Sequence, residues 1–111
     1  MNANADAVLE TLRARLDGID EELLDRVRRR FECCVDIAHY KREHGVPMMQ
    51  PDRVRRVHDR AARYGAVHGI DEVFLRRLYQ LIVDEACRVE DVVIAGGAHP
   101  RCFSGERTEG A

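Results

Sequence analysis

Residues 12–30 read LRARLDGIDEELLDRVRRR, and this stretch decides the fold. Its apolar residues recur in steps of three and four, which is the spacing of one face of an α-helix. The same pattern extends in both directions without a proline and with only one glycine. We expect one long helix from about residue 6 to about residue 43, ended by His44-Gly45 before Val46-Pro47. The apolar positions of this helix are Val8, Leu12, Leu16, Ile19, Leu23, Val27, Cys34 and Ala38.

Two shorter helices are expected after the long one. Gln50-Pro51-Asp52 begins the second, because proline suits the first turn of a helix, and the pattern fades between Tyr64 and Gly69. Asp71 is a suitable N-cap for the third helix, which continues to about Ile94. The apolar stripe of the third helix consists of Phe74, Leu78, Ile82, Ala86, Val89 and Val93. The sequence thus predicts an all-α domain over residues 1–94 and a flexible Gly-rich tail over residues 95–111.

The length of the first helix predicts an oligomer. About 35 residues of helix are ~50 Å long, whereas a compact chain of about 100 residues has a radius of gyration of only ~13 Å. The apolar stripe of this helix would be left in water unless a second copy covered it. We therefore expect an intertwined helical homodimer.

Composition and charge exclude several function classes. Hydrophobic residues make up 45% of the 111 residues, charged residues 34% and aromatics 5%, which is typical of a helical protein with an aliphatic core. A net charge of -2 provides no global positive field for nucleic acid or an anionic membrane. The sequence contains neither a basic segment followed by an apolar run at its start nor 18 consecutive apolar residues. We expect a cytoplasmic protein that binds neither nucleic acid nor membranes.

Cysteines and histidines predict no metal centre and no cofactor. Cys33, Cys34, Cys87 and Cys102 lack CxxC spacing, and the five histidines form no HExxH pair. Neither a P-loop nor a GxGxxG motif is present. We expect reduced and mostly buried thiols.

Charged residues interrupt the apolar stripes of the first and third helices. Arg30 and Lys41 are eleven residues apart, close to three turns, so both lie on the face that carries Cys34. Glu90 follows Ala86 by one turn on the third helix. Either the cations only cover apolar surface with their stems and pair with Glu90, or the three groups form a site.

The remaining candidate cations have an ordinary interpretation. Arg53 opens the second helix and can belong to a solvated face shared with Arg56, Arg60 and Arg63. Arg13 can likewise be a surface charge within a face of salt bridges.

The stretch LRARLDGIDEELLDRVRRR, followed by Lys41 eleven residues after Arg30, resembles the helical chorismate mutase family. The resemblance spans about residues 8–94 and implies three helices per chain in an intertwined dimer. It also implies roles for individual residues. Arg13 would reach one substrate carboxylate from the partner chain, and Arg30 would bind a carboxylate from its own chain. Lys41 and Glu90 would lie at the ether oxygen, and Arg53 would face the ring hydroxyl.

The chemistry of that family suits these residue types. The resemblance implies a pericyclic rearrangement of an enolpyruvyl ether, a small dicarboxylate, without a cofactor or metal. Arginines grip carboxylates in bidentate fashion and hold the ether in its reactive conformation. Lys41 and a protonated Glu90 would stabilise the negative charge that develops on the ether oxygen.

The sequence departs from ordinary chorismate mutases at two positions. The family usually has Glu after the arginine matched by Arg53, where it accepts a hydrogen bond from the 4-hydroxyl, and here that residue is Val54. Ala86 stands where the bacterial enzymes frequently have Ser. An ammonium group at the 4-position could be held by backbone carbonyls of Met49 or Gln50.

The longer strings VPMMQPDRV and CRVEDVV resemble the family members of antibiotic-producing actinomycetes that convert 4-amino-4-deoxychorismate to 4-amino-4-deoxyprephenate. This resemblance implies the same reaction here, on the way to p-aminophenylalanine units. Three alternatives stay open. They are a chorismate mutase, an isochorismate pyruvate-lyase, and a dimeric helical module that binds a partner through Arg26, Arg28, Arg29 and Arg30.

Overall fold

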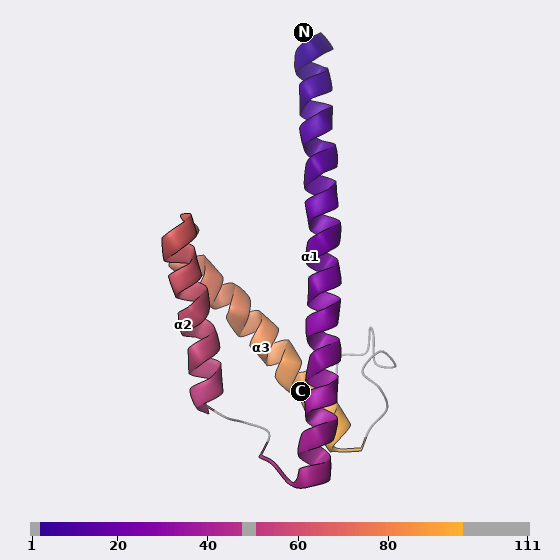
Figure 1. Ribbon diagram of the computed structural model, residues 1–111, viewed down its shortest axis with the longest axis vertical. Helices are drawn as coiled ribbons and strands as arrows, with labels where there is room; N and C mark the ends of the chain where they lie inside the picture. Colours follow the sequence, from indigo (N-terminus) through magenta and orange to yellow (C-terminus); the bar gives the residue numbers. More distant parts are fainter. Residues whose placement is uncertain (1–2, 48–50, 97–111) are drawn as a thin grey trace. The chain divides into compact units, whose positions relative to one another are not determined.

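A computed structural model describes residues 3–47 and 51–96, and this part of the chain is helical without any strand. Its three helices confirm the all-α prediction (Figure 1). Their bounds are α1 (Ala3–His44), α2 (Pro51–His68) and α3 (Glu72–Ile94).

The helices begin and end where local chemistry requires it. Gly45 stops α1 with a φ of 65°, and the N–H of Val46 donates to the carbonyl of Lys41 at 3.0 Å. Asp71 caps α3, since its carboxylate accepts from the N–H of Phe74 at 3.0 Å. Both signals were predicted from the sequence and both are confirmed.

The chain divides into two compact parts, one up to Glu32 and the other from Cys33 onward. The first part is α1 up to Glu32, and the apolar stripe of this stretch is exposed to solvent. Five of its side chains are 49–58% exposed: Val8, Leu12, Leu16, Ile19 and Leu23. An apolar stripe of this length agrees with the expected dimer, which stays a prediction.

In the second part, α2 and α3 form a helical hairpin and run in opposite directions (Figure 1). Small residues on α2 allow a close approach, because Ala61, Ala62 and Gly65 are all buried. The turn is fixed by a hydrogen bond of 2.9 Å from the N–H of Ile70 to the carbonyl of Gly65.

The carboxyl-terminal turns of α1 pack on those of α3. Val35 and Ala38 of α1 form a buried cluster with Val89 and Val93 of α3, and Ile94 packs against it. Ala38 is fully inaccessible to solvent. This small core determines which side chains of the last turns of the two helices can meet.

Two expectations about individual side chains were wrong. Phe74 is 53% exposed although it belongs to the predicted apolar stripe of α3, and its neighbour Leu75 is buried instead. The reason is that the close turn at Gly65 brings α2 over Leu75. The thiols are also less buried than expected: Cys33 is exposed and Cys87 is only half-buried, whereas Cys34 is buried, and all three are free.

Residues 95 and 96 are the described start of the predicted tail, and residues 97–111 lie outside the described part. In the described residues no helix has the length and apolar character needed to span a bilayer.

Candidate active site

The core between α1 and α3 brings one cation and one carboxylate together. Lys41 follows Ala38 by three residues on α1, and Glu90 directly follows Val89 on α3. Because Ala38 and Val89 belong to the same buried cluster, the two charged side chains meet beside it. The ammonium of Lys41 donates to Oε1 of Glu90 at 3.2 Å.

This ion pair is largely withdrawn from water. The side chain of Lys41 is 14% exposed and that of Glu90 is 12% exposed. Breaking such a pair by removing one partner is costly, since the other charge is then buried without compensation. The sequence allowed either a salt bridge or a site at these residues, and the observed pair confirms the salt bridge without excluding the site.

A third polar group lies next to the pair. Cys87 is three residues before Glu90 on α3 and is half-buried. Burial raises the pKa of the Cys87 thiol, and the nearby carboxylates of Glu90, Asp91 and Asp84 raise it further, whereas Lys41 lowers it. The thiol is therefore held neutral beside Lys41 and Glu90.

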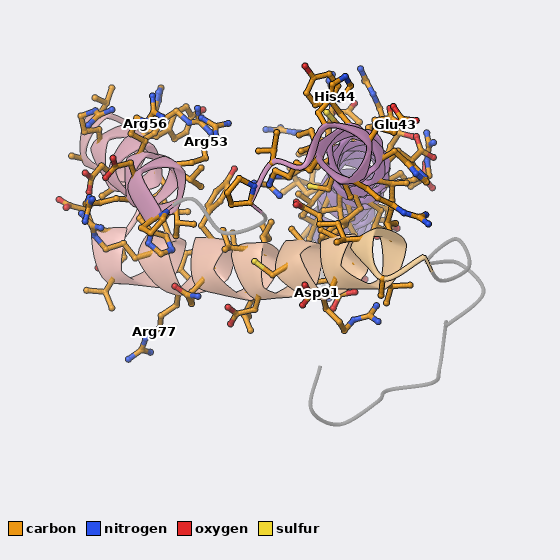
Figure 2. The ribbon with its side chains drawn as sticks, turned by 90° about the horizontal axis from the view of Figure 1, so that it is seen from below. Glu43, His44, Arg53, Arg56, Arg77 and Asp91 are labelled. Carbon is orange, nitrogen blue, oxygen red and sulfur yellow. The ribbon has the colours of Figure 1, made fainter. Side chains whose placement is uncertain are left out.

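The other predicted site residues of the second part have different surroundings. Ala86, one turn before Glu90, is buried, and Val54 on α2 is half-buried. Arg53 is exposed and points away from α3 (Figure 2). The structure thus does not bring Arg53 to the ion pair of Lys41 and Glu90.

Two predicted site residues belong to the first compact part of the chain. Arg13 is exposed and lies 3.6 Å from Oε2 of Glu10, one turn earlier on α1. Arg30 is half-buried. Their roles stay predictions, as do those of Met49 and Gln50, which lie outside the described residues.

Sequence reasoning overlooked Arg42. Its guanidinium lies at the carboxyl end of α3, where a Cβ on Gly96 would be 3.1 Å from Nη2. The last turn of α3 contains no basic residue of its own, so Arg42 places a cation near its terminal carbonyls from α1. The absence of a basic residue in that turn could have indicated that a cation from elsewhere in the chain lies there. The sequence could not identify Arg42 as that cation, because its position depends on how α1 packs on α3.

The hairpin also carries an apolar groove of about 300 Å³, lined by Arg60, Ala61, Tyr64, Ile70, Leu75 and Tyr79. None of the predicted site residues lines this groove. It is a feature separate from the ion pair.

The ion pair supplies the groups needed to stabilise charge on a ligand oxygen. The ammonium of Lys41 is a hydrogen-bond donor that donates to Glu90, and a protonated Glu90 would donate as well. Donors in a site with little water stabilise a developing oxyanion far more than they would in bulk solvent. Among the described residues, no group of three His, Cys, Asp or Glu side chains is arranged to hold a metal ion.

A pair of this kind between two helices, in a chain whose described residues form helices, fits a class of enzyme that stabilises charge with cations and acids. The chain belongs to the chorismate mutase type II family, whose sequence model matches residues 12–91. This confirms the family resemblance seen in the sequence, and the chain is accordingly an isomerase of the chorismate mutase type.

Particular relatives narrow the comparison. The chain is 58% identical over 92 residues to the 4-amino-4-deoxychorismate mutase of Streptomyces pristinaespiralis, covering 83% of this chain and 71% of the relative. It is 61% identical over 87 residues to the enzyme of the same name from Streptomyces venezuelae, and the match covers 78% of this chain and 84% of the relative. The chorismate mutase of Methanocaldococcus jannaschii is 26% identical over 76 residues, and the match covers 68% of this chain and 77% of the relative.

Proposed function

We propose that the protein converts 4-amino-4-deoxychorismate to 4-amino-4-deoxyprephenate, which can supply p-aminophenylalanine-type building blocks. The observation that carries the proposal is the buried pair of Lys41 and Glu90, in a chain about 60% identical to two enzymes named for this substrate. The reaction class needs charge stabilisation at one oxygen, and Lys41 and Glu90 are groups of the kind that supply it.

The reaction is an intramolecular rearrangement in which atoms and charge balance without a co-reactant. The bond between the ring carbon and the ether oxygen breaks while a carbon–carbon bond forms from the enolpyruvyl methylene to the ring. The ether oxygen gains negative charge in the transition state and becomes the keto oxygen of the product. The ammonium of Lys41 donates to this oxygen, and protonated Glu90 donates beside it.

Arginines hold the two carboxylates of the substrate in this proposal. Arg30 binds one carboxylate, and the equivalent of Arg13 on a second chain binds the other, so that each site of a homodimer is completed by both chains. Bidentate contacts fix the ether in the folded conformation that reacts. Arg53 turns its long side chain toward the ring when the substrate binds.

Val54 and Ala86 support a substrate that differs from chorismate at the 4-position of the ring. A buried 4-hydroxyl facing Val54 would lose a hydrogen-bond acceptor, which costs ~1–3 kcal/mol. The aliphatic side chains of Val54, which is half-buried, and of Ala86, which is buried, contain no hydrogen-bond acceptor. Backbone carbonyls of Met49 or Gln50 would hold the ammonium of the amino substrate instead.

Kinetic assays of the purified protein on 4-amino-4-deoxychorismate, chorismate and isochorismate test the proposal. We expect the highest kcat/KM for the amino substrate, and Val54→Glu should narrow or reverse its advantage over chorismate. A clear preference of the wild type for chorismate would contradict the substrate assignment and favour a chorismate mutase. Release of pyruvate from isochorismate as the main reaction would favour the lyase.

A further inference from the structure

The outer face of α2 carries an unusual concentration of positive charge. The helix contains five arginines and two aspartates, a net charge of +3 with histidines neutral, whereas the whole chain has a net charge of -2. The other residues together are therefore negatively charged and would repel an anion. An anionic substrate is attracted by the charge of this helix.

Three of these arginines form a line that leads to Arg53. Arg56, Arg60 and Arg63 follow Arg53 in steps of three and four residues and hence share one side of α2. All four are exposed, and Arg53 and Arg56 point away from α3 into solvent (Figure 2). We call Arg56, Arg60 and Arg63 the arginine stripe.

The charges of the stripe are not neutralised by neighbouring carboxylates. Asp52 of α2 forms an ion pair with Arg55, and Asp59 forms one with Arg76 of α3 at 3.4 Å. Both aspartates of the helix are thus engaged with other arginines. Within residues 3–47 and 51–96, no carboxylate is paired with a member of the arginine stripe.

We infer that the arginine stripe attracts the dianionic substrate toward the site by long-range electrostatics, without touching it in the reacting complex. The inference rests on the proposed function, which supplies a substrate with two carboxylates. From Arg53 to Arg63 the helix rises by ~15 Å, a distance over which charges interact at low ionic strength because the Debye length is then ~30 Å. Such fields raise the local concentration of an oppositely charged substrate and its rate of association.

Coulomb's law with salt screening gives the size of the effect. The three cations should raise kcat/KM several-fold at ~10 mM ionic strength and by much less at ~150 mM. At about 0.5 M salt the Debye length falls to roughly 4 Å and the effect should vanish. Because the stripe does not contact the reacting atoms, kcat should not change.

The test compares the triple variant Arg56→Gln, Arg60→Gln, Arg63→Gln with the wild type over this range of salt. We expect kcat/KM to be several-fold lower at ~10 mM ionic strength, to converge with the wild type at high salt, and kcat to be unchanged. The matching triple substitution by Lys keeps the charge and should retain wild-type kcat/KM. As a control, Arg77→Gln removes an exposed arginine of α3 that points away from α2 (Figure 2), and it should lower kcat/KM less than Arg60→Gln does.

Two results overturn the inference: an equal kcat/KM of the Gln triple variant and the wild type at low salt, or a loss that persists undiminished at high salt. A loss of activity in the Lys triple variant would also overturn it, because charge alone would then not suffice. Absence of any mutase activity in the wild type is a different outcome, which would refute the proposed function itself.

Discussion

The ion pair of Lys41 and Glu90 shows what the positions of residues along two helices can and cannot predict. Spacing along the sequence placed both residues on apolar stripes, and it predicted a salt bridge or a site. The spacing could not predict that Nζ of Lys41 lies 3.2 Å from Oε1 of Glu90, because this distance depends on how Ala38 and Val89 pack. The role of Arg53 at the ring of the substrate stays a prediction, since the direction of a long exposed side chain depends on its surroundings rather than on helical register.

The protonation of Glu90 can be tested at this scale. A carboxylate only accepts hydrogen bonds, so Glu90 donates to the ether oxygen only when it is protonated. In the proposed mechanism the donor form is the active one, so turnover by the wild type should decrease as pH rises. Glu90→Gln keeps a donor of similar shape that does not titrate, and its kcat should lose most of this decline and equal or exceed the wild type at high pH.

Profiles of kcat against pH for the two proteins provide the measurement. Lys41→Ala serves as the reference for an inactive site, with an expected loss of about 100-fold or more in kcat for removal of one such donor. If wild type and Glu90→Gln decline in parallel, another group titrates, and Glu90 is only the structural partner of Lys41.

At the scale of elements, the contact between α2 and α3 depends on one glycine. A Cβ on Gly65 would lie 2.6 Å from the carbonyl oxygen of Ile70 and 2.9 Å from Cδ1 of Leu75. The backbone oxygen of Ile70 cannot yield without moving the turn that the hydrogen bond from Ile70 to Gly65 fixes. Gly65→Ala should destabilise the protein by ~1–3 kcal/mol through overpacking.

Gly18 offers a matched control in α1, because no atom lies within 4 Å of a Cβ built on it. Gly18→Ala should stabilise the helix by ~0.5–1 kcal/mol, since Ala has the higher helix propensity. Urea unfolding of both variants and the wild type measures the two free energies. A Gly65→Ala variant as stable as the wild type would show that α2 and α3 do not approach this closely in solution.

The same glycine explains which parts of the fold the sequence could predict. Helix ends follow from local signals, and both Gly45 and Asp71 were recognised because φ and capping involve only neighbouring residues. The burial of Leu75 in place of Phe74 was not recognised, because both positions suit an apolar stripe. Only the approach of α2 at Gly65 selects between them.

At the scale of the whole molecule, the feature that still needs an explanation is the solvent-exposed apolar stripe of the first compact part. Leu12, Leu16 and Leu23 are each about half exposed in the single chain, although residues of this kind contribute most to stability when buried. A second copy that presents the same stripe would cover them in a symmetric arrangement. Light scattering at micromolar concentration should then report a dimer.

The sharing of sites between chains follows from that dimer and from the proposed role of Arg13. Homodimers of Arg13→Ala and of Lys41→Ala should both be nearly inactive. In a mixed dimer, one site has Lys41 of the first chain and Arg13 of the second intact, while the other site lacks both. Co-refolding of equal amounts should therefore restore about a quarter of wild-type activity, since half of the dimers are mixed and each has one working site.

The control is a mixture of Arg30→Ala and Lys41→Ala, because these two residues are assigned to the site of the same chain. This mixture should recover no activity, since every site of the mixed dimer lacks either Arg30 or Lys41. Equal recovery in both mixtures, or none with Arg13→Ala despite mixed dimers verified by native mass spectrometry, would show that Arg13 does not complete the site of its partner.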